Sequence, residues 1–223
     1  MRRPILAATV LAATALAIAL TSGCATRQLA RTVGAGRTEF GVLVGGPLQS
    51  TLGGLAAPVP EHRVHGRVGL TDDLDLSGSV PFAPLASAVL ALDVGLVAQL
   101  VRTPDFAMSL SGRLHVLLDL DDGFGDDVFP ELGLHLEQRL DPRVAIIFGA
   151  SALAQASQPP ERPGVFLAPY VGGEVLLGEH ALSLALGWIN PWDTTLTSIA
   201  WEPEGAGAIT VTFGWRIQPG GVR

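Results

Sequence analysis

Lysine is absent from this sequence of 223 residues, and charge of either sign is scarce. All 14 basic residues are arginine, and 16% of the chain is charged, against 48% that is hydrophobic. A soluble domain carries about 25% charged residues, with lysine among the commonest residue types. These shortages argue against a soluble globular exterior and indicate that an apolar environment surrounds much of the protein.

Cysteine occurs once, as Cys24, so no intrachain disulfide can form. A lone thiol in an oxidising compartment is a liability unless it is modified. Two arginines near the N-terminus precede an apolar run from Ile5 to Leu20, and small residues at 21–23 lead to the cysteine. This is the order of a secretory signal peptide. The run is shorter than the roughly 20 residues that a membrane-spanning helix needs.

The segment around Cys24 resembles the lipobox of bacterial lipoproteins, in which the cysteine after the cut carries diacylglycerol through a thioether. The resemblance implies a signal peptide over 1–23, a covalent lipid on Cys24, a lipidated tether over 24–37, and the lipoprotein-sorting machinery as a partner. The sequence departs from the family at Thr21, where leucine is usual. Ala25, in place of aspartate, implies the outer membrane. An ordinary signal peptide with a free thiol is the alternative.

Net charge argues against nucleic acid as a partner. Without residues 1–23 the chain keeps 12 basic and 21 acidic residues, a net charge of −9. Proteins that bind nucleic acid neutralise phosphates with basic patches, which this balance does not favour. The oligomeric state is left open.

Helical periodicity is also missing after Cys24, and apolar residues alternate with a period of two. From Met108 to Leu120 the even positions are apolar or glycine, whereas the odd positions include serine, arginine, histidine and aspartate. Such alternation predicts β-strands. Several reach or exceed the 9 to 11 residues, roughly, of a tilted membrane strand, whereas strands in soluble sheets average about 5 to 6. The ten predicted strands are 38–45, 62–70, 74–80, 90–101, 108–120, 131–137, 144–156, 165–177, 182–188 and 209–217.

The connections between these strands alternate in length. Tight turns are expected at 71–73, 103–105, 141–143 and 179–180. Longer connections are expected at about 45–61, 81–87, 121–127, 157–164 and 190–208. Membrane barrels have short periplasmic turns and longer outer loops. The sequence therefore predicts an all-β fold, an antiparallel up-and-down transmembrane β-barrel of about 10 strands over 38–218 with a tail at 219–223.

Two stretches carry a resemblance to bacterial outer-membrane barrels of the porin-like type. Residues 67–76, Arg-Val-Gly-Leu-Thr-Asp-Asp-Leu-Asp-Leu, resemble periplasmic hairpins, and residues 212–217, Thr-Phe-Gly-Trp-Arg-Ile, resemble the C-terminal insertion signal. Residues 218–223 depart from it, because the family ends on an aromatic residue. The resemblance implies an outer-membrane location with both chain ends in the periplasm, membrane lipid and the barrel-assembly machinery as partners, and a structural or small-solute-permeation role.

A soluble alternative stays open at this point. A periplasmic lipoprotein with a lipocalin-like or β-sandwich domain that binds a lipid or another apolar ligand has the same alternation. In that protein the row formed by Leu110, Leu114 and Leu118 faces its own core, whereas in a membrane barrel the row faces lipid. The direction of this row therefore separates the two hypotheses.

The opposite face of the strands mixes small residues with charges of both signs, which suits a narrow barrel lumen. If 103–105 is a turn, Asp93 lies opposite His115 and Gly95 opposite Arg113. Across the next hairpin we expect Arg113 opposite Glu137, His115 opposite His135 and Asp119 opposite Glu131. The predicted lumen network that occludes the barrel comprises Arg63, His65, Arg67, Asp93, Arg113, His115, Asp119, Glu131, His135 and Glu137.

Metal binding is the weaker interpretation of two groups. His115, His135, Asp119 and Glu131 offer imidazole and carboxylate ligands, but a structural network accounts for them equally. Four aspartates, Asp121, Asp122, Asp126 and Asp127, crowd one outer loop. Their spacing does not fit an EF-hand, so a solvated turn is favoured over a divalent-cation site. No other cofactor is expected.

Catalysis is not expected. The sequence has no Ser-His-Asp arrangement, phosphate-binding loop or His-Glu-x-x-His motif. The omptin proteases are ten-stranded outer-membrane barrels, but their chemistry needs histidine and aspartate together at the outer rim. Here His62, beside Glu61, is the nearest candidate, and His115 and His135 are expected deeper in the barrel.

Overall fold

The computed structural model describes residues 29–50, 56–58, 61–82, 89–119, 123–154, 165–189 and 208–220. All regular secondary structure in these ranges is β-strand. None of the described residues forms a helix long and apolar enough to cross a membrane. The strands are β1 (Thr38–Ser50), β2 (Ala56–Pro58), β3 (Glu61–Gly69), β4 (Leu74–Pro81), β5 (Val89–Arg102), β6 (Phe106–Asp119), β7 (Gly123–Asp141), β8 (Val144–Ala154), β9 (Val165–Leu177), β10 (His180–Ile189) and β11 (Ala208–Ile217).

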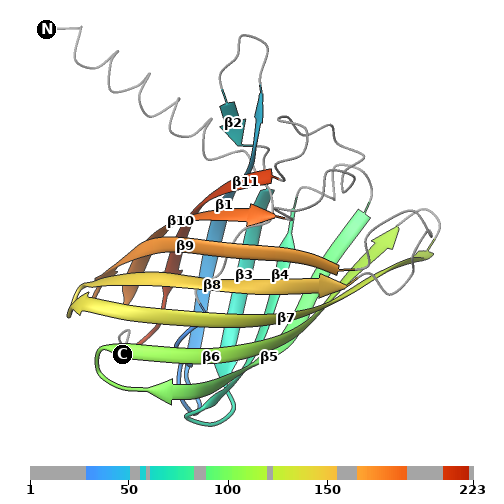
Figure 1. Cartoon of the computed structure of the whole chain (residues 1–223). Coiled ribbons are helices and arrows are strands. Elements are labelled where there is room, and N and C mark those ends of the chain that lie inside the picture. The colour runs from blue at the N-terminus through green and yellow to red at the C-terminus, as the bar shows by residue number, and fades with distance from the viewer. Residues whose placement is uncertain are drawn as a thin grey trace, which may run out of the picture.

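The strands close into one antiparallel barrel (Figure 1). From β3 to β11 each strand pairs with the next, β1 pairs with β3, and β11 returns to pair with β1 from Phe40↔Ile217 to Pro47↔Thr210. The short β2 pairs only with residues 48–50 at the end of β1, so it extends one hairpin and is not a separate strand of the barrel wall. The predicted ten-stranded antiparallel barrel is confirmed.

Tight turns gather at one end of the barrel, which we call the tight-turn end. They comprise residues 70–73, 103–105, 142–143 and 178–179, and the C-terminus lies at the same end (Figure 1). Gly178 adopts a φ of 69°, which glycine tolerates without steric cost. The longer connections lie at the other end. The connection between β6 and β7 is at this end too, but it is short, because β6 ends at Asp119 and β7 begins at Gly123. These strands stay paired out to Asp119↔Gly123, with an irregularity between Val116 and Leu118.

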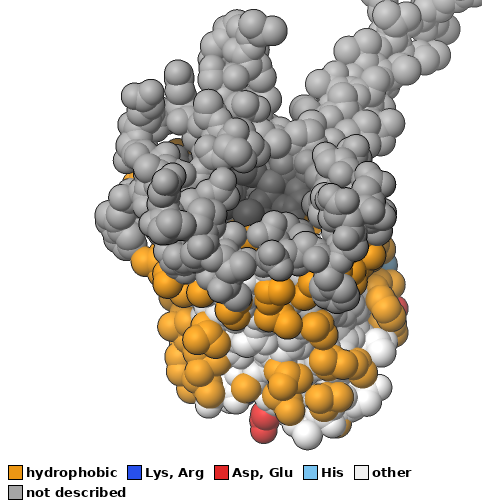
Figure 2. Space-filling view, turned by 90° about the vertical axis from the view of Figure 1, so that its right-hand side faces the viewer, with side chains coloured by type: hydrophobic (Ala, Val, Ile, Leu, Met, Phe, Trp, Pro, Cys, Tyr) orange, Lys and Arg blue, Asp and Glu red, His pale blue; other side chains and the backbone are white. Residues whose placement is uncertain are grey.

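The alternation along each strand separates an apolar outer face from a polar inner one. In β4 the outward Leu76 is exposed, whereas its neighbours Asp75 and Ser77 are buried. Figure 2 shows hydrophobic side chains spread over one side of the exterior. Leu110 and Leu114 are 47% and 40% exposed, so the row that distinguishes the hypotheses faces outward. The soluble alternative, which needs this row in its own core, is therefore wrong.

Candidate functional site

Charged side chains fill the interior of the barrel and neutralise one another. Burial of an unpaired charge is costly, so charges inside a narrow barrel persist only when they are paired. Here each arginine has a carboxylate partner and each carboxylate has an arginine. The arginines in these ion pairs are Arg31, Arg63, Arg67, Arg113, Arg139 and Arg216, and the carboxylates are Glu39, Asp75, Asp93, Glu131, Glu137 and Glu174.

One cluster, which we call the central cluster, joins β3 to β7 through Asp93 and Glu131. Asp93 accepts hydrogen bonds from Arg113 and, at 3.1 Å, from Arg63 Nη1. Arg113 also pairs with Glu131 at 3.3 Å, and Glu131 lies 2.5 Å from His115 Nε2. The chain of contacts runs along the inner wall from β3 to β7 and places its charged side chains in the lumen.

A second cluster, the seam cluster, bridges the strands that close the barrel. Arg216 on β11 contacts Glu174 on β9 through two hydrogen bonds, at 2.9 and 2.8 Å, and reaches Glu39 on β1 at 2.6 Å. Arg67 on β3 contacts the same Glu39 through two hydrogen bonds of 2.9 Å. Bidentate contacts of this kind fix geometry as well as charge. The seam cluster therefore ties four strands together across the β1–β11 closure.

A further group of polar side chains, Ser111, His135 and Tyr170, lies on the wall formed by β6, β7 and β9. Ser111 Oγ is 2.8 Å from His135 Nε2, and His135 Nδ1 is 2.8 Å from the Tyr170 hydroxyl. Gly133 makes room for the pair, because a Cβ there would lie 2.6 Å from both the serine oxygen and the histidine nitrogen. Although serine and histidine are adjacent, all three side chains are buried and the third partner is tyrosine instead of a carboxylate. The arrangement reads as structural support.

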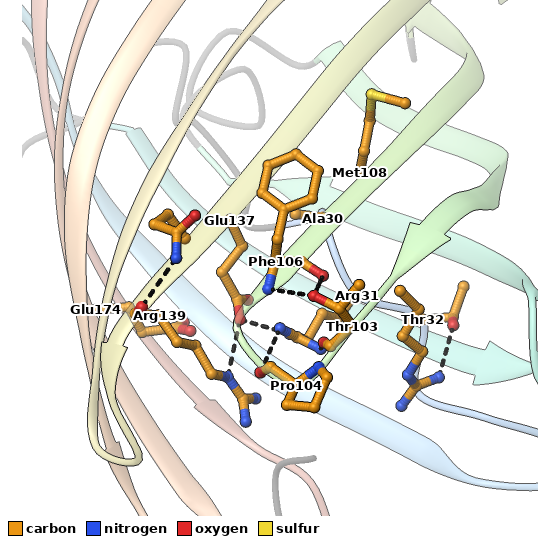
Figure 3. Close-up of polar contacts among 12 residues, drawn as sticks. Ala30, Arg31, Thr32, Thr103, Pro104, Phe106, Met108, Glu137, Arg139 and Glu174 are labelled. Carbon is orange, nitrogen blue, oxygen red and sulfur yellow. Dashed lines mark hydrogen bonds and ion pairs between the residues drawn. The ribbon is translucent and has the colours of Figure 1, made fainter.

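The N-terminal segment Leu29–Val33 occupies the lumen at the tight-turn end; we call it the lumen segment. It lies within the range predicted as a tether, and all five of its residues are buried. Arg31 Nε donates to Glu137 at 2.5 Å, and the two remaining guanidinium nitrogens donate to the carbonyls of Thr103 and Pro104 at 3.0 and 3.1 Å. Figure 3 shows Glu137 between Arg31 and Arg139, which donates to it at 3.0 Å.

The structure brings most of the predicted network residues into the lumen, in a partly different register. Asp93 does pair with His115, and Gly95 with Arg113. The register predicted for the next hairpin is wrong, because Arg113 pairs with Glu131, whereas His135 pairs with Ser109 and Glu137 with Ala107. His115 and His135 therefore do not face each other. The side chain of Asp119 lies outside the described residues.

The error in register comes from the predicted loop at 121–127. β7 already begins at Gly123, so residues 123–127 belong to a strand. Asp126 and Asp127 lie in this strand and their side chains are not described, while Asp121 and Asp122 lie outside the described residues. No group of three or more potential ligands occurs in the described part of the chain. His62, the candidate for catalysis, lies on β3 opposite Val44, and its neighbour Arg63 points inward.

The lumen contains residues that the predicted network left out, namely Arg31, Glu39, Asp75, Arg139, Tyr170, Glu174 and Arg216. Glu39 alternates with the outward Phe40, and Tyr170 lies on the same face of its strand as the buried Glu174. Both were within reach of the period-two test. Arg31 carries no such signal, because its segment has no period and its position depends on the lumen around it.

Comparisons with known proteins find likeness in shape alone. No protein-family model and no curated protein matches the chain. Among solved structures, the NanC porin is 9% identical with a TM-score of 0.48, covering 81% of this chain and 98% of its own. An outer-membrane channel from Pseudomonas putida F1 is 12% identical with a TM-score of 0.47, covering 86% and 99%. The outer-membrane protease OmpT from Escherichia coli is 9% identical with a TM-score of 0.40, covering 82% and 94%.

Proposed function

We propose that this chain is a lipid-anchored outer-membrane β-barrel with a small-solute-permeation role, closed in the state described above. The observation that carries the proposal is the outward apolar face of a closed barrel with an ion-paired interior. Exposed apolar side chains recur on the four successive strands β7 to β10, for example Leu132, Ile146, Val171 and Leu184. Exposure of apolar surface to water costs about 25 cal/mol per Å², whereas a bilayer removes that cost.

The proposed anchor is a diacylglycerol on Cys24, added after removal of residues 1–23. Cys24 precedes the lumen segment by the residues 24–28, which in extended form span about 17 Å. That reach allows the lipid to return to the rim at the tight-turn end. In this arrangement the tight turns and the C-terminus lie in the periplasm, and the lipoprotein-sorting and barrel-assembly machineries deliver the protein.

Fractionation tests the membrane assignment. We expect the full chain with Cys24→Ala, after signal-peptide removal, to stay in the membrane fraction through a carbonate wash and to need detergent for extraction. The barrel alone has enough outward apolar surface for this. Release of the Cys24→Ala protein into the soluble fraction would overturn the proposal, because the lipid would then be the sole attachment.

Permeation and a purely structural role separate in planar bilayers. The buried side chains of the central cluster and the buried lumen segment occupy space inside the barrel, so the unmodified protein is expected to pass little current. Arg113→Ala removes a large buried cation that bridges Asp93 and Glu131, and the steady ion current is expected to rise. An outward substitution, Leu114→Ala, is the matched control and leaves the current unchanged. Silence in both variants would instead support a plugged, structural barrel.

A further inference from the structure

The barrel wall contacts the backbone of the lumen segment at almost every residue. Gln99 Nε2 donates to the Ala30 carbonyl at 2.7 Å, and Gln99 Oε1 accepts from the Thr32 amide at 3.0 Å. Ser109 Oγ donates to the Leu29 carbonyl at 2.5 Å. These hydrogen bonds are made to backbone atoms, so they do not depend on the side chain that each residue carries. The wall therefore recognises an extended backbone.

The same recognition continues toward the tight-turn end. Arg67 Nη1 donates to the Arg31 carbonyl at 2.9 Å, and the carboxylate of Asp75 accepts from the Val33 amide at 3.0 and 3.2 Å. Gln218 Nε2 donates to the Val33 carbonyl at 3.1 Å. Strands β3, β4, β5 and β6 and the residue after β11 thus supply one continuous set of donors and acceptors.

The charged wall groups are already fixed by the barrel. Arg67 is held by its two hydrogen bonds to Glu39, and it also pairs with Asp75 at 3.4 Å. Asp75 is fully buried. A site whose polar groups are oriented before the ligand arrives binds with a smaller entropic cost. Arg67 and Asp75 therefore each have an ionic partner in the barrel besides the segment.

One side chain of the segment is recognised by charge. Arg31 enters a pocket made by the Glu137 carboxylate and the carbonyls of Thr103 and Pro104 (Figure 3). All three acceptors suit a guanidinium, and Glu137 is itself buried. Thr32 adds a neutral contact, since its hydroxyl donates to the Asp72 carbonyl at 2.7 Å. The pocket therefore selects an arginine at the third position of the bound segment.

The lumen segment belongs to no strand. In the described chain the first bridge to the sheet is the isolated pair Ala35↔Gly69, and β1 begins only at Thr38. Removal of residues 29–33 from the lumen therefore breaks no hydrogen bond between paired strands of the barrel. The segment is held as a ligand is held, by side chains of the wall.

We propose that the tight-turn end of the lumen is a binding site for an extended peptide with arginine at its third position. The chain's own residues 29–33 fill this site reversibly. The proposal goes beyond the permeation role, and it stands on peptide contacts that exist whether or not the lumen conducts. A covalently attached segment has an effective concentration of about millimolar, so a free peptide competes only when the attached one is weakened.

The test uses the full chain in detergent and a fluorescent peptide of residues 28–34, Gln-Leu-Ala-Arg-Thr-Val-Gly. Arg31→Glu weakens the attached segment by placing two carboxylates together, while the wall stays intact. In the unmodified protein the attached segment fills the site. We therefore expect the Arg31→Glu variant to bind the peptide about tenfold more tightly than the unmodified protein does. A peptide with glutamate in place of arginine should not bind. Adding Glu137→Arg to Arg31→Glu restores the attached pair with reversed charge and should abolish binding of the arginine peptide.

A thiol probe reports the position of the attached segment directly. In a Cys24→Ala background, a Thr32→Cys thiol should be protected from a maleimide, and it should react in the Arg31→Glu variant. Gln99→Ala, which removes two backbone contacts, is the second variant and should expose the same thiol. The heat-dependent gel shift of folded barrels confirms that each variant is folded. A thiol that stays protected in both folded variants, or equal binding of the arginine and glutamate peptides, would overturn the proposal.

Discussion

Arg216→Met tests whether the seam cluster stabilises the barrel closure. The guanidinium is the ion-pair partner of Glu174 on one side and shares Glu39 with Arg67 on the other. Its removal leaves Glu39 with one arginine, whereas Glu174 loses the arginine that neutralises it. Loss of one partner from a buried pair costs about 3 to 5 kcal/mol. That is on the order of a hundred- to several-thousand-fold in the folding equilibrium.

Urea unfolding of the proteins refolded into lipid vesicles measures this loss, because Arg216→Met and the unmodified protein can be compared at equal lipid content. The matched control is Arg216→Met combined with Glu174→Leu, which removes both charges. Replacement of a whole buried pair by apolar residues is often neutral or stabilising. We expect the double variant to recover most of the lost stability. A loss below about 1 kcal/mol in Arg216→Met, or a double variant as unstable as the single one, would refute the reasoning.

Other substitutions test the wall and the outer face. Gly133→Ala places a methyl group 2.6 Å from Ser111 Oγ and His135 Nε2, and overpacking of this kind costs about 1 to 3 kcal/mol; unchanged urea stability would contradict the tight fit. Leu132→Arg places a charge on a side chain that is 73% exposed, and we expect a loss of about 2 to 4 kcal/mol in vesicles. Equal stability of Leu132→Arg and the unmodified protein in vesicles would argue that this position does not face lipid.

The sequence predicts the barrel well because apolar and polar residues alternate with a period of two along its strands. In β6 every second residue is apolar or glycine, and both the strand and its outward face follow from the period alone. The 103–105 turn then sets the β5–β6 register, since a tight turn leaves few ways to pair the strands. Local pattern and short connections together were sufficient for these elements.

The register between β6 and β7 could not be predicted from the sequence, for a physical reason. Residues 123–127 are rich in glycine and aspartate, which favour turns, and yet they extend a strand whose pairing slips between Val116 and Leu118. Strand propensity at this position is overridden by pairing with β6. The predicted partners of Arg113 and His115 were therefore displaced to Glu131, although both residues still point inward.

The lumen segment shows a second limit. Leu29 to Val33 has no period, and its conformation is set by wall groups that come from strands far along the chain. No local rule identifies such a segment. Its burial depends on the completed barrel, so its site becomes visible only in three dimensions.

The most direct test of the outward apolar face is the environment of inward and outward side chains on β6. With Cys24→Ala, single cysteines at Leu110, Ser111 and Leu114 can carry nitroxide labels, and collision with dissolved oxygen reports contact with lipid. We expect high oxygen accessibility at 110 and 114 and low accessibility at 111 in vesicles. Low accessibility at 110 and 114 together with a lipid-exposed 111 would contradict an apolar face turned toward the membrane.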